Sequence, residues 1–197
     1  VNVLWDARPA VGDRIAVVGG GMVGLCVARL LAGIPGAEVT LVDLNPGRQR
    51  QASELGVGFA TPESAAAASG GTLDLVIHAS ATEAGLQTSL DLLGVEGTVV
   101  DASWYGRRAV ALGLGGGFHS RRLTIRSSQV GRVPPDRSAR WTASQRLALA
   151  LRLLADPAYD VLLTGTSPFR ELPDLMSRLA TGDQQAICHL ITYPEGD

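Results

Sequence analysis

Short apolar runs alternate with segments whose apolar residues recur three or four positions apart, from residue 14 onward. The runs predict buried strands, and the spaced segments predict amphipathic helices. Strands are expected at residues 14–19, 37–43, 57–60, 73–79, 97–102 and 123–127. Helices are expected at residues 22–32, 45–55, 62–68 and 138–155, and after Thr82 with Leu86, Leu90 and Leu93 on one face. This alternation indicates right-handed βαβ units and an α/β fold with a doubly wound parallel sheet.

The C-terminal part of the chain repeats this alternation on a smaller scale. Asp156-Pro157 ends the preceding helix. A strand is then expected at residues 160–163, a helix at 173–180 that ends at Gly182, and a strand at 186–192. We therefore expect two parts, a doubly wound domain over residues 1–158 and a strand-helix-strand appendage over residues 159–197.

A glycine-rich turn joins the first strand to the first helix. Residues 19–24 read Gly-Gly-Gly-Met-Val-Gly and match the pattern G-x-G-x-x-G directly between a strand and a helix. Gly19 permits the tight turn, Gly21 lets the backbone approach a pyrophosphate, and Gly24 lets helix and strand pack closely. The N–H groups at the start of that helix suit phosphate oxygens. The pattern predicts a dinucleotide-binding Rossmann fold. The structural alternative is a glycine-rich turn that binds no ligand.

An aspartate ends the second strand. Asp43 lies 43 − 24 = 19 positions beyond Gly24, close to the spacing of about 20 at which an acidic residue accepts hydrogen bonds from the adenosine ribose. A carboxylate there repels a 2′-phosphate, so we expect NAD as the cofactor in preference to NADP. Arg48 and Arg50 lie nearby and could tolerate a phosphate. Helix capping is the structural alternative for Asp43, although Asn45 already fills that position.

Small and polar residues follow the fourth and fifth strands. Ligands of doubly wound sheets lie outside the carboxyl ends of the strands, so His78 to Ser80 and Ala102 to Trp104 are expected to face the same crevice. Their small side chains leave room for a flat nicotinamide ring. His78 is a candidate base, but a packed strand residue is the simpler interpretation. Trp104 and Tyr105 either cover the cofactor or cap the sheet.

Composition excludes several other classes of protein. The net charge is −2, which gives no reason to expect nucleic acid or an acidic membrane as partner. All 17 basic residues are arginine, so a Walker phosphate loop and a Schiff-base enzyme, which both need lysine, are excluded. The apolar stretch at residues 15–28 is too short to span a bilayer. Cys26 and Cys188 form no metal-ligand pattern and suit a reducing cytoplasm, where we expect the protein.

Several segments together resemble the medium-chain dehydrogenase/reductase superfamily, in particular its zinc-type alcohol dehydrogenases. These segments cover nearly the whole chain: Trp5 to Pro9 with Val11 to Arg14, Asp43 to Gly56, Asp74 to Ser80, Leu90 to Val100, Ile125 to Gly131, and Asp183 to Ile191. His78 departs from the family pattern, which often has an acidic residue there. The resemblance also implies pairing of two sixth strands across a two-fold axis, and hence a homodimer through residues 123–127.

The resemblance assigns cofactor contacts residue by residue. Gly19, Gly21, Met22 and Val23 would line the pyrophosphate, and Asp43 with Arg48 would hold the adenosine ribose. The nicotinamide side would be formed by Ala79, Ser80, Ala102, Ser103, Trp104, Ser128 and Gln129.

The family's catalytic domain, with its zinc ligands and most of the substrate pocket, would precede the Rossmann domain. Here only about a dozen residues precede the first strand, and Cys26, His78, His119, Cys188 and His189 form no zinc site. No catalytic residue or metal ligand is therefore assigned to this chain.

The expected function is cofactor binding within an NAD-dependent alcohol dehydrogenase-like oxidoreductase that transfers a hydride between an alcohol and nicotinamide. The chain alone is expected to bind cofactor without turnover. Two alternatives stay open, a stand-alone NAD-binding module without catalysis and part of a zinc-independent quinone or enoyl reductase. Asp43 argues against the second, because such reductases prefer NADP.

Overall fold

The computed structural model describes residues 1–194 and contains two compact units. The first unit is Val1–Asp156, and the second begins at Pro157. The boundary therefore falls two residues before the one expected from sequence.

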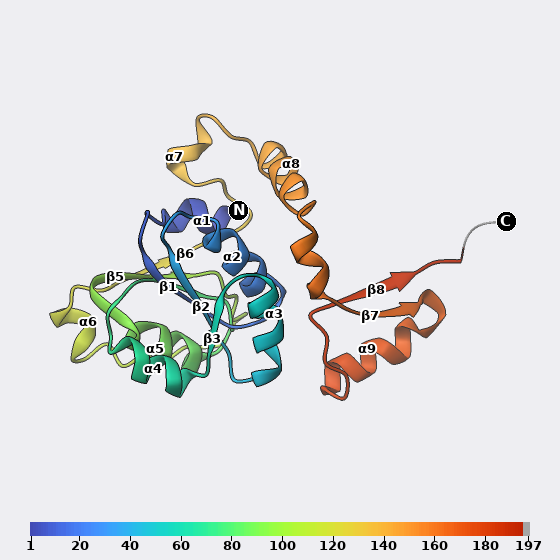
Figure 1. Ribbon diagram of the computed structural model, residues 1–197, viewed down its shortest axis with the longest axis horizontal. Helices are drawn as coiled ribbons and strands as arrows, with labels where there is room; N and C mark the ends of the chain where they lie inside the picture. The colour runs from blue at the N-terminus through green and yellow to red at the C-terminus, as the bar shows by residue number, and fades with distance from the viewer. Residues whose placement is uncertain (195–197) are drawn as a thin grey trace. The chain divides into compact units, whose positions relative to one another are not determined.

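A six-stranded parallel sheet forms the centre of the first unit (Figure 1). Its strands are β1 (Arg14–Val18), β2 (Glu38–Val42), β3 (Gly58–Ala60), β4 (Leu73–His78), β5 (Leu93–Asp101) and β6 (Thr124–Ser127). They lie in the order β3-β2-β1-β4-β5-β6, and every neighbouring pair is parallel. This is the doubly wound Rossmann arrangement, so the predicted fold class is confirmed. The strand order reverses between β1 and β4, which opens a crevice at their carboxyl ends.

Helices cover both faces of this sheet (Figure 1). They include α2 (Met22–Ala32), α3 (Gln49–Glu54), α4 (Pro62–Ser69) and α5 (Glu83–Asp91). The central strands are buried on both sides, which explains why they read as unbroken apolar runs. Side chains of α4 and α5 pack with those of β1, β4 and β5 in one apolar cluster that includes Ala65, Leu86 and Val76.

Hydroxyl side chains fix where the helices on this face begin. The Thr61 hydroxyl accepts a hydrogen bond from Ser64 N–H at 3.3 Å, and Ser64 Oγ in turn accepts one from Thr61 N–H at 2.9 Å. Thr82 accepts from Gly85 N–H at 3.0 Å and caps α5, as predicted. Such caps satisfy donors that have no partner within the helix.

Three details of the first unit differ from the sequence-based expectation. Leu93 begins β5 instead of continuing α5, which ends at Asp91. The helix expected over residues 138–155 is the shorter α8 (Ala143–Leu153), because Thr142 and Gln145 form a capping box that starts it later, and a separate short helix, α7 (Pro135–Ser138), precedes it. The short elements α1 (Asn2–Ala7), α6 (Gly117–Ser120) and the 3-10 turn η1 (Pro46–Arg48) were not anticipated as separate elements.

The second unit is a small strand-helix-strand structure. After the 3-10 turn η2 (Pro157–Leu162) come β7 (Leu163–Pro168), η3 (Phe169–Glu171), α9 (Leu172–Thr181) and β8 (Cys188–Thr192). β7 and β8 pair in parallel, so the predicted appendage is present. The strand expected at residues 160–163 was wrong, because this apolar run lies in η2 and the strand starts only at Leu163. Gly182 ends α9 at a φ of 82°, as its position suggested.

Candidate functional site

The glycine turn lies between β1 and α2 and leaves space at the start of the helix. Gly19 has a φ of 111°, and a Cβ there would lie 2.7 Å from the backbone nitrogen of Ser80. A Cβ on Gly24 would lie 1.9 Å from the carbonyl oxygen of Gly19. A Cβ on Gly21 would meet no atom within 4 Å. Gly19 and Gly24 are therefore needed to build the turn, whereas Gly21 borders open space at the start of the helix.

Asp43 follows β2 and is fixed beside this turn. Its Oδ2 accepts a hydrogen bond from Gly20 N–H at 2.5 Å, and its Oδ1 accepts one from Asn45 N–H at 2.8 Å. Arg48 lies on the same side, with its Cγ 3.0 Å from where a Cβ on Gly20 would be. Each carboxylate oxygen keeps a further lone pair, so Asp43 can still accept hydrogen bonds from a ligand.

A cavity of about 330 Å³ opens beside Asp43 at the carboxyl ends of the strands. Asp43 and Leu44 line it from the β2 side, Pro62 and Glu63 from the start of α4, and Ser80 with Thr82 from the loop after β4. The volume is at the lower end of the range for small-molecule sites. Sequence reasoning assigned Ser80 to the nicotinamide side, whereas the structure groups it with Asp43 in one cavity.

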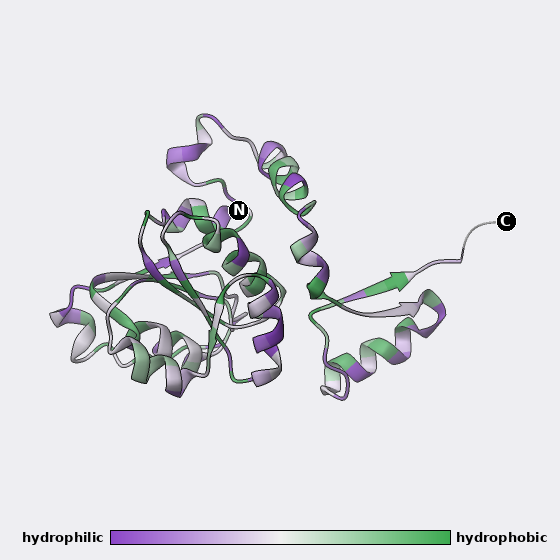
Figure 2. Ribbon diagram, viewed as in Figure 1, coloured by the Kyte–Doolittle hydropathy of each residue, from purple (hydrophilic) through white to green (hydrophobic). Residues whose placement is uncertain are grey.

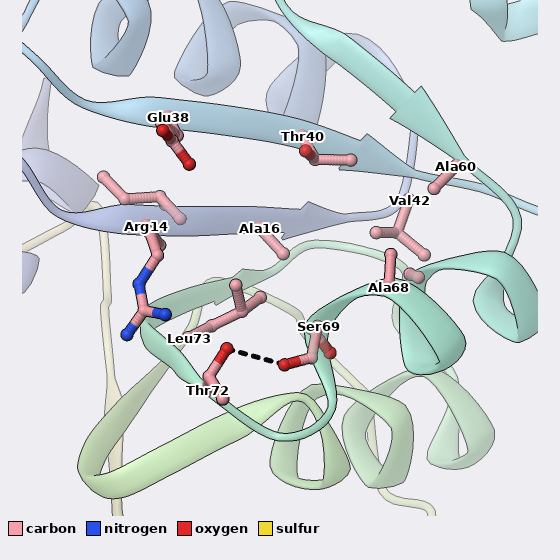
Figure 3. Close-up of a pocket in the computed structure, with 12 residues that line it drawn as sticks. Arg14, Ala16, Glu38, Thr40, Val42, Ala60, Ala68, Ser69, Thr72 and Leu73 are labelled. Atoms are coloured by element: carbon pink, nitrogen blue, oxygen red, sulfur yellow. Dashed lines mark hydrogen bonds between the residues drawn. The ribbon is translucent and has the colours of Figure 1, made fainter.

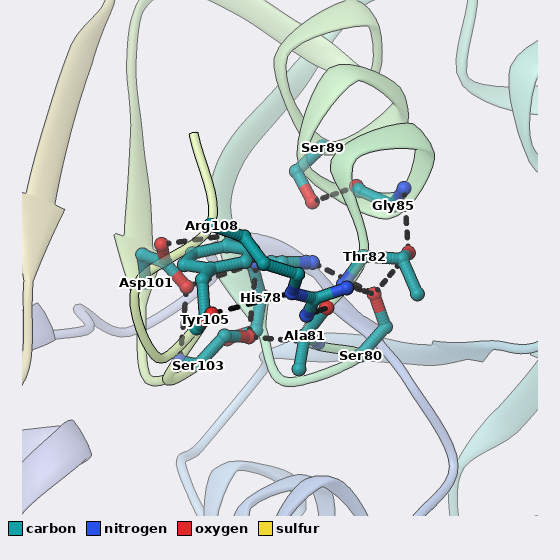
Figure 4. Close-up of polar contacts among 10 residues, drawn as sticks. All are labelled: His78, Ser80, Ala81, Thr82, Gly85, Ser89, Asp101, Ser103, Tyr105 and Arg108. Atoms are coloured by element: carbon teal, nitrogen blue, oxygen red, sulfur yellow. Dashed lines mark hydrogen bonds and ion pairs between the residues drawn. The ribbon is translucent and has the colours of Figure 1, made fainter. Parts of the chain in front are cut away.

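Behind Ser80 lies a buried network centred on His78, the last residue of β4 (Figure 4). The His78 side chain is fully buried, and its Nδ1 is 2.9 Å from Oδ1 of Asp101, the last residue of β5. Its Nε2 is 2.7 Å from Ser80 Oγ. Tyr105 stacks on the His78 ring and donates to Asp101 Oδ2 at 3.2 Å. Ser103 N–H donates to Asp101 Oδ1 at 2.9 Å.

The hydrogen bonds of this network keep Asp101 ionised. Burial alone would raise the pKa of the Asp101 carboxyl, but the hydrogen bonds from His78 and from Ser103 N–H outweigh it and hold that pKa below its usual value. The pKa of the Tyr105 phenol is raised by burial and by the Asp101 carboxylate. Tyr105 is therefore a neutral donor at physiological pH, and Asp101 is an acceptor.

Gly85, in the first turn of α5, leaves room for the Ser80 hydroxyl. A Cβ on Gly85 would lie 2.1 Å from Ser80 Oγ, 2.8 Å from Thr82 Oγ1 and 3.0 Å from His78 Nε2. Ser80 Oγ is also 2.9 Å from Thr82 Oγ1. Because Gly85 has no Cβ, the polar atoms of Ser80, Thr82 and His78 can meet beside the first turn of α5.

The other residues expected at the site lie around the same edge of the sheet. Met22 and Val23, at the start of α2, are 37% and 55% exposed. Ala79 and Ala102 follow β4 and β5, and Ala102 N–H donates to His78 O at 2.9 Å. The Trp104 side chain is 86% exposed, so it caps no part of the sheet.

Two predicted residues follow β6 and are occupied by contacts within the chain. Ser128 Oγ donates to the Asp6 carboxylate at 2.6 Å, and its N–H donates to Asp101 O at 2.8 Å. Gln129 Oε1 accepts from Gly131 N–H at 2.6 Å. These contacts anchor the loop after β6 beside the ends of α1 and β5.

A second cavity, of about 300 Å³, runs between α4 and the sheet and reaches Val42 and Ala60 at the carboxyl ends of β2 and β3 (Figure 3). Arg14, Glu38 and Leu73, which begin β1, β2 and β4, line it together with residues of α4 such as Ala65 and Ala68. The alanines of α4 are too short to fill the space between helix and sheet. Val42 lines both cavities, but none of residues 19–24 lines this one, so we do not assign it to the cofactor.

Within residues 1–194, no cluster of three or more histidine, cysteine, aspartate or glutamate side chains could hold a metal ion. No helix in this part of the chain has both the length and the apolar character that a membrane crossing needs.

Comparison with solved structures identifies the fold. An alcohol dehydrogenase from a Thermus species matches with a TM-score of 0.75 and 19% identity, over 98% of this chain and 54% of its own. An Escherichia coli alcohol dehydrogenase in complex with NADH matches with a TM-score of 0.73 and 20% identity, over 96% of this chain and 54% of its own. A putative zinc-binding dehydrogenase from Sinorhizobium meliloti bound to NADP gives 0.73 and 21%, over 98% and 54%.

The chain spans about half the length of these structures. Its fold is the one that this half has in alcohol dehydrogenases, as the sequence resemblance implied. No protein-family model matches the sequence, and no curated protein matches it.

Proposed function

We propose that this chain is the cofactor-binding part of an NAD-dependent, alcohol dehydrogenase-like oxidoreductase of the medium-chain superfamily. The observation that carries the proposal is the pairing of an open glycine turn at Gly21 with the Asp43 carboxylate, which is hydrogen-bonded to Gly20. The two features lie where strand order reverses, the place at which doubly wound sheets bind dinucleotides.

Different residues are proposed to contact different parts of the cofactor. Backbone N–H groups at Gly21, Met22 and Val23 face the pyrophosphate, with Gly19 and Gly24 shaping the turn. Asp43 and Arg48 hold the adenosine ribose. The location of Ser80 and Thr82 in the Asp43 cavity supports an adenosine-side role for them. The nicotinamide side is left to Ala79, Ala102, Ser103, Trp104, Ser128 and Gln129.

NAD is the proposed cofactor, with NADP as the weaker ligand. The Asp43 carboxylate would face the 2′-phosphate of NADP, and like charges at short distance repel. Solved relatives of the fold carry NADH in one case and NADP in another. Discrimination between them therefore depends on residues such as Asp43 and Arg48, not on the fold.

The cofactor supplies the hydride chemistry, and this chain's residues bind and orient it. The alcohol or carbonyl substrate and any catalytic zinc belong, in this proposal, to a further domain. The exposed apolar side chains of the second unit support such a partner: Leu163, Phe169, Met176, Leu190 and Tyr193. α8 has no buried residue either, and Leu147 and Leu151 are 60% and 61% exposed. Figure 2 shows apolar and polar positions alternating along α8 and α9.

A stand-alone NAD-binding module is the second candidate, since every residue proposed to contact the cofactor lies in the unit Val1–Asp156. Calorimetric titration of the 197-residue chain with NADH tests both candidates at once. We expect saturable binding with one NADH per chain, and its absence would overturn both. Fusion of the chain to an alcohol dehydrogenase catalytic domain would then distinguish the two candidates. Alcohol-dependent reduction of NAD by the fusion supports the dehydrogenase, and its absence supports the stand-alone module.

A further inference from the structure

The contact between Asp101 and His78 determines which imidazole nitrogen carries the hydrogen. The ionised carboxylate has no hydrogen to donate, and its Oδ1 is 2.9 Å from Nδ1. An imidazole that carries a single hydrogen therefore has it on Nδ1 here, and Nε2 presents a lone pair. Since His78 is fully buried, protein groups alone determine this choice.

The Nε2 lone pair then orients two hydroxyl groups in sequence. Ser80 Oγ lies 2.7 Å from Nε2 and donates its only hydrogen to it. Thr82 Oγ1 lies 2.9 Å from Ser80 Oγ, so Thr82 is the donor in that pair. Thr82 Oγ1 also accepts from Gly85 N–H at 3.0 Å. Ser80 Oγ also accepts from Thr82 N–H at 3.4 Å. Both hydroxyl hydrogens thus point along the chain of hydrogen bonds toward Asp101, and only Thr82 Oγ1 keeps a lone pair for the cavity.

The carboxylates of the cavity are acceptors as well. Asp43 and Glu63 line it on the sides formed by β2 and α4. Of its polar side chains, only the Thr88 hydroxyl, one turn further along α5, is outside this set of carboxylates and oriented hydroxyls. A ligand that matches the cavity must therefore bring hydrogen-bond donors, because a ligand acceptor would remain unpaired against these oxygens.

We propose that the His78–Ser80–Thr82 chain makes the adenosine end of the site selective for a 6-amino purine over a 6-oxo purine. This inference rests on the proposed function. The donors of adenosine are its ribose hydroxyls, which suit Asp43, and its 6-amino group, which suits the remaining lone pair of Thr82 Oγ1. A 6-oxo base has an acceptor at that position. Thr82 is the specificity-determining contact, and Ser80 with His78 and Asp101 acts as a positioning group behind it.

Competing dinucleotides test the selectivity on the 197-residue chain. Calorimetry should show NAD⁺ binding about tenfold or more tightly than nicotinamide hypoxanthine dinucleotide, since a site built for a donor rejects an analogue that lacks it. Ser80→Ala should bring the two affinities close together. Thr88→Val is the matched control in the same cavity and should keep the difference. Equal affinities in the unmodified chain, or a loss of the difference in the control alone, would overturn the inference while leaving the proposed function intact.

The positioning role has a separate readout. Heteronuclear NMR of the His78 imidazole nitrogens should show hydrogen on Nδ1 and a lone pair on Nε2. In Asp101→Leu this pattern should be lost, and the selectivity should narrow although Ser80 is retained. Hydrogen on Nε2 of His78 in the unmodified chain would turn the Ser80 hydrogen toward Thr82 and overturn the inference. This measurement needs no variant, so it stands even if Asp101→Leu does not fold. Failure of both dinucleotides to bind would instead overturn the proposed function, and this inference with it.

Discussion

The Asp43 carboxylate accepts a hydrogen bond from the Gly20 amide at 2.5 Å and thereby ties the end of β2 to the glycine turn after β1. Asp43 and Gly20 come from separate strand ends, 23 positions apart in the sequence. Their contact places a fixed negative charge beside the start of α2. The proposed division into a ribose site and a pyrophosphate site depends on this one contact.

Two glycines of the turn should respond differently to substitution. Gly21→Val should abolish NADH binding while the fold persists, because the Gly21 Cβ direction is open and its φ of −80° suits any residue. Gly24→Ala should destabilise the chain itself, since the new Cβ would lie 1.9 Å from Gly19 O. Circular dichroism melting and NADH titration of both variants separate the two effects. Unchanged NADH affinity in Gly21→Val would reduce the turn to a structural role.

The lowered pKa of Asp101 predicts an acid-sensitive contribution to stability. A carboxyl whose folded-state pKa lies below its unfolded value of about 3.9 stabilises the fold above that pH. The contribution disappears as the pH falls through the folded-state pKa. Asp101→Asn should therefore lower Tm at pH 7, and its deficit should shrink steadily below about pH 4.

Asp136→Asn is the control for this pH series. Asp136 forms an ion pair with Arg8 in which both side chains are well exposed, so its removal should change Tm little at any pH. A deficit in Asp101→Asn that is the same at pH 7 and at pH 3 would show that its charge contributes nothing to stability.

The open edge at β6 should form a homodimer. β6 is the last strand of the sheet, and three of its four residues are exposed, with Ile125 the exception. An edge strand of this kind can pair with a second copy across a two-fold axis. Light scattering of the unmodified chain should give a dimer mass. A monomeric mass for the unmodified chain at high concentration would refute the pairing.

The second unit should open before the sheet does. A two-stranded sheet with one helix buries little apolar surface and is marginally stable in isolation. Hydrogen exchange should therefore be faster at the amides of Cys188–Thr192 than at those of Arg14–Val18. Equal protection at both strands would make the second unit part of the stable core and would argue for a self-sufficient module.

Local signals explain what could be predicted from the sequence. The bounds of α2 follow from Gly21 and Gly33 at its ends, and Asn45, Thr82 and Gly182 all cap helices where expected. Errors arose where an apolar period ran across a boundary. Leu93 continues the spacing of Leu86 and Leu90 but lies in a strand, because α5 already ends at Asp91.

The hydrogen-bond network around His78 could not be predicted from the sequence, because it depends on the register between β4 and β5. Asp101 and Tyr105 lie 23 and 27 positions from His78. They meet it only because β4 and β5 pair with His78 opposite Asp101. The one available signal was that a polar residue ends each of two neighbouring strands. That signal made His78 a candidate base but could not identify its partners or its orientation.

Parallel titrations of the 197-residue chain with NADH and NADPH test the central claim most directly. The account predicts saturable binding of NADH and weaker binding of NADPH, by on the order of 1–3 kcal/mol, because a 2′-phosphate would face the Asp43 carboxylate. In Asp43→Ser the difference between the two affinities should narrow, mainly because the affinity for NADPH rises. Identical titration curves for the two cofactors on the unmodified chain would contradict the assignment of Asp43. If neither cofactor binds, the proposed function is wrong.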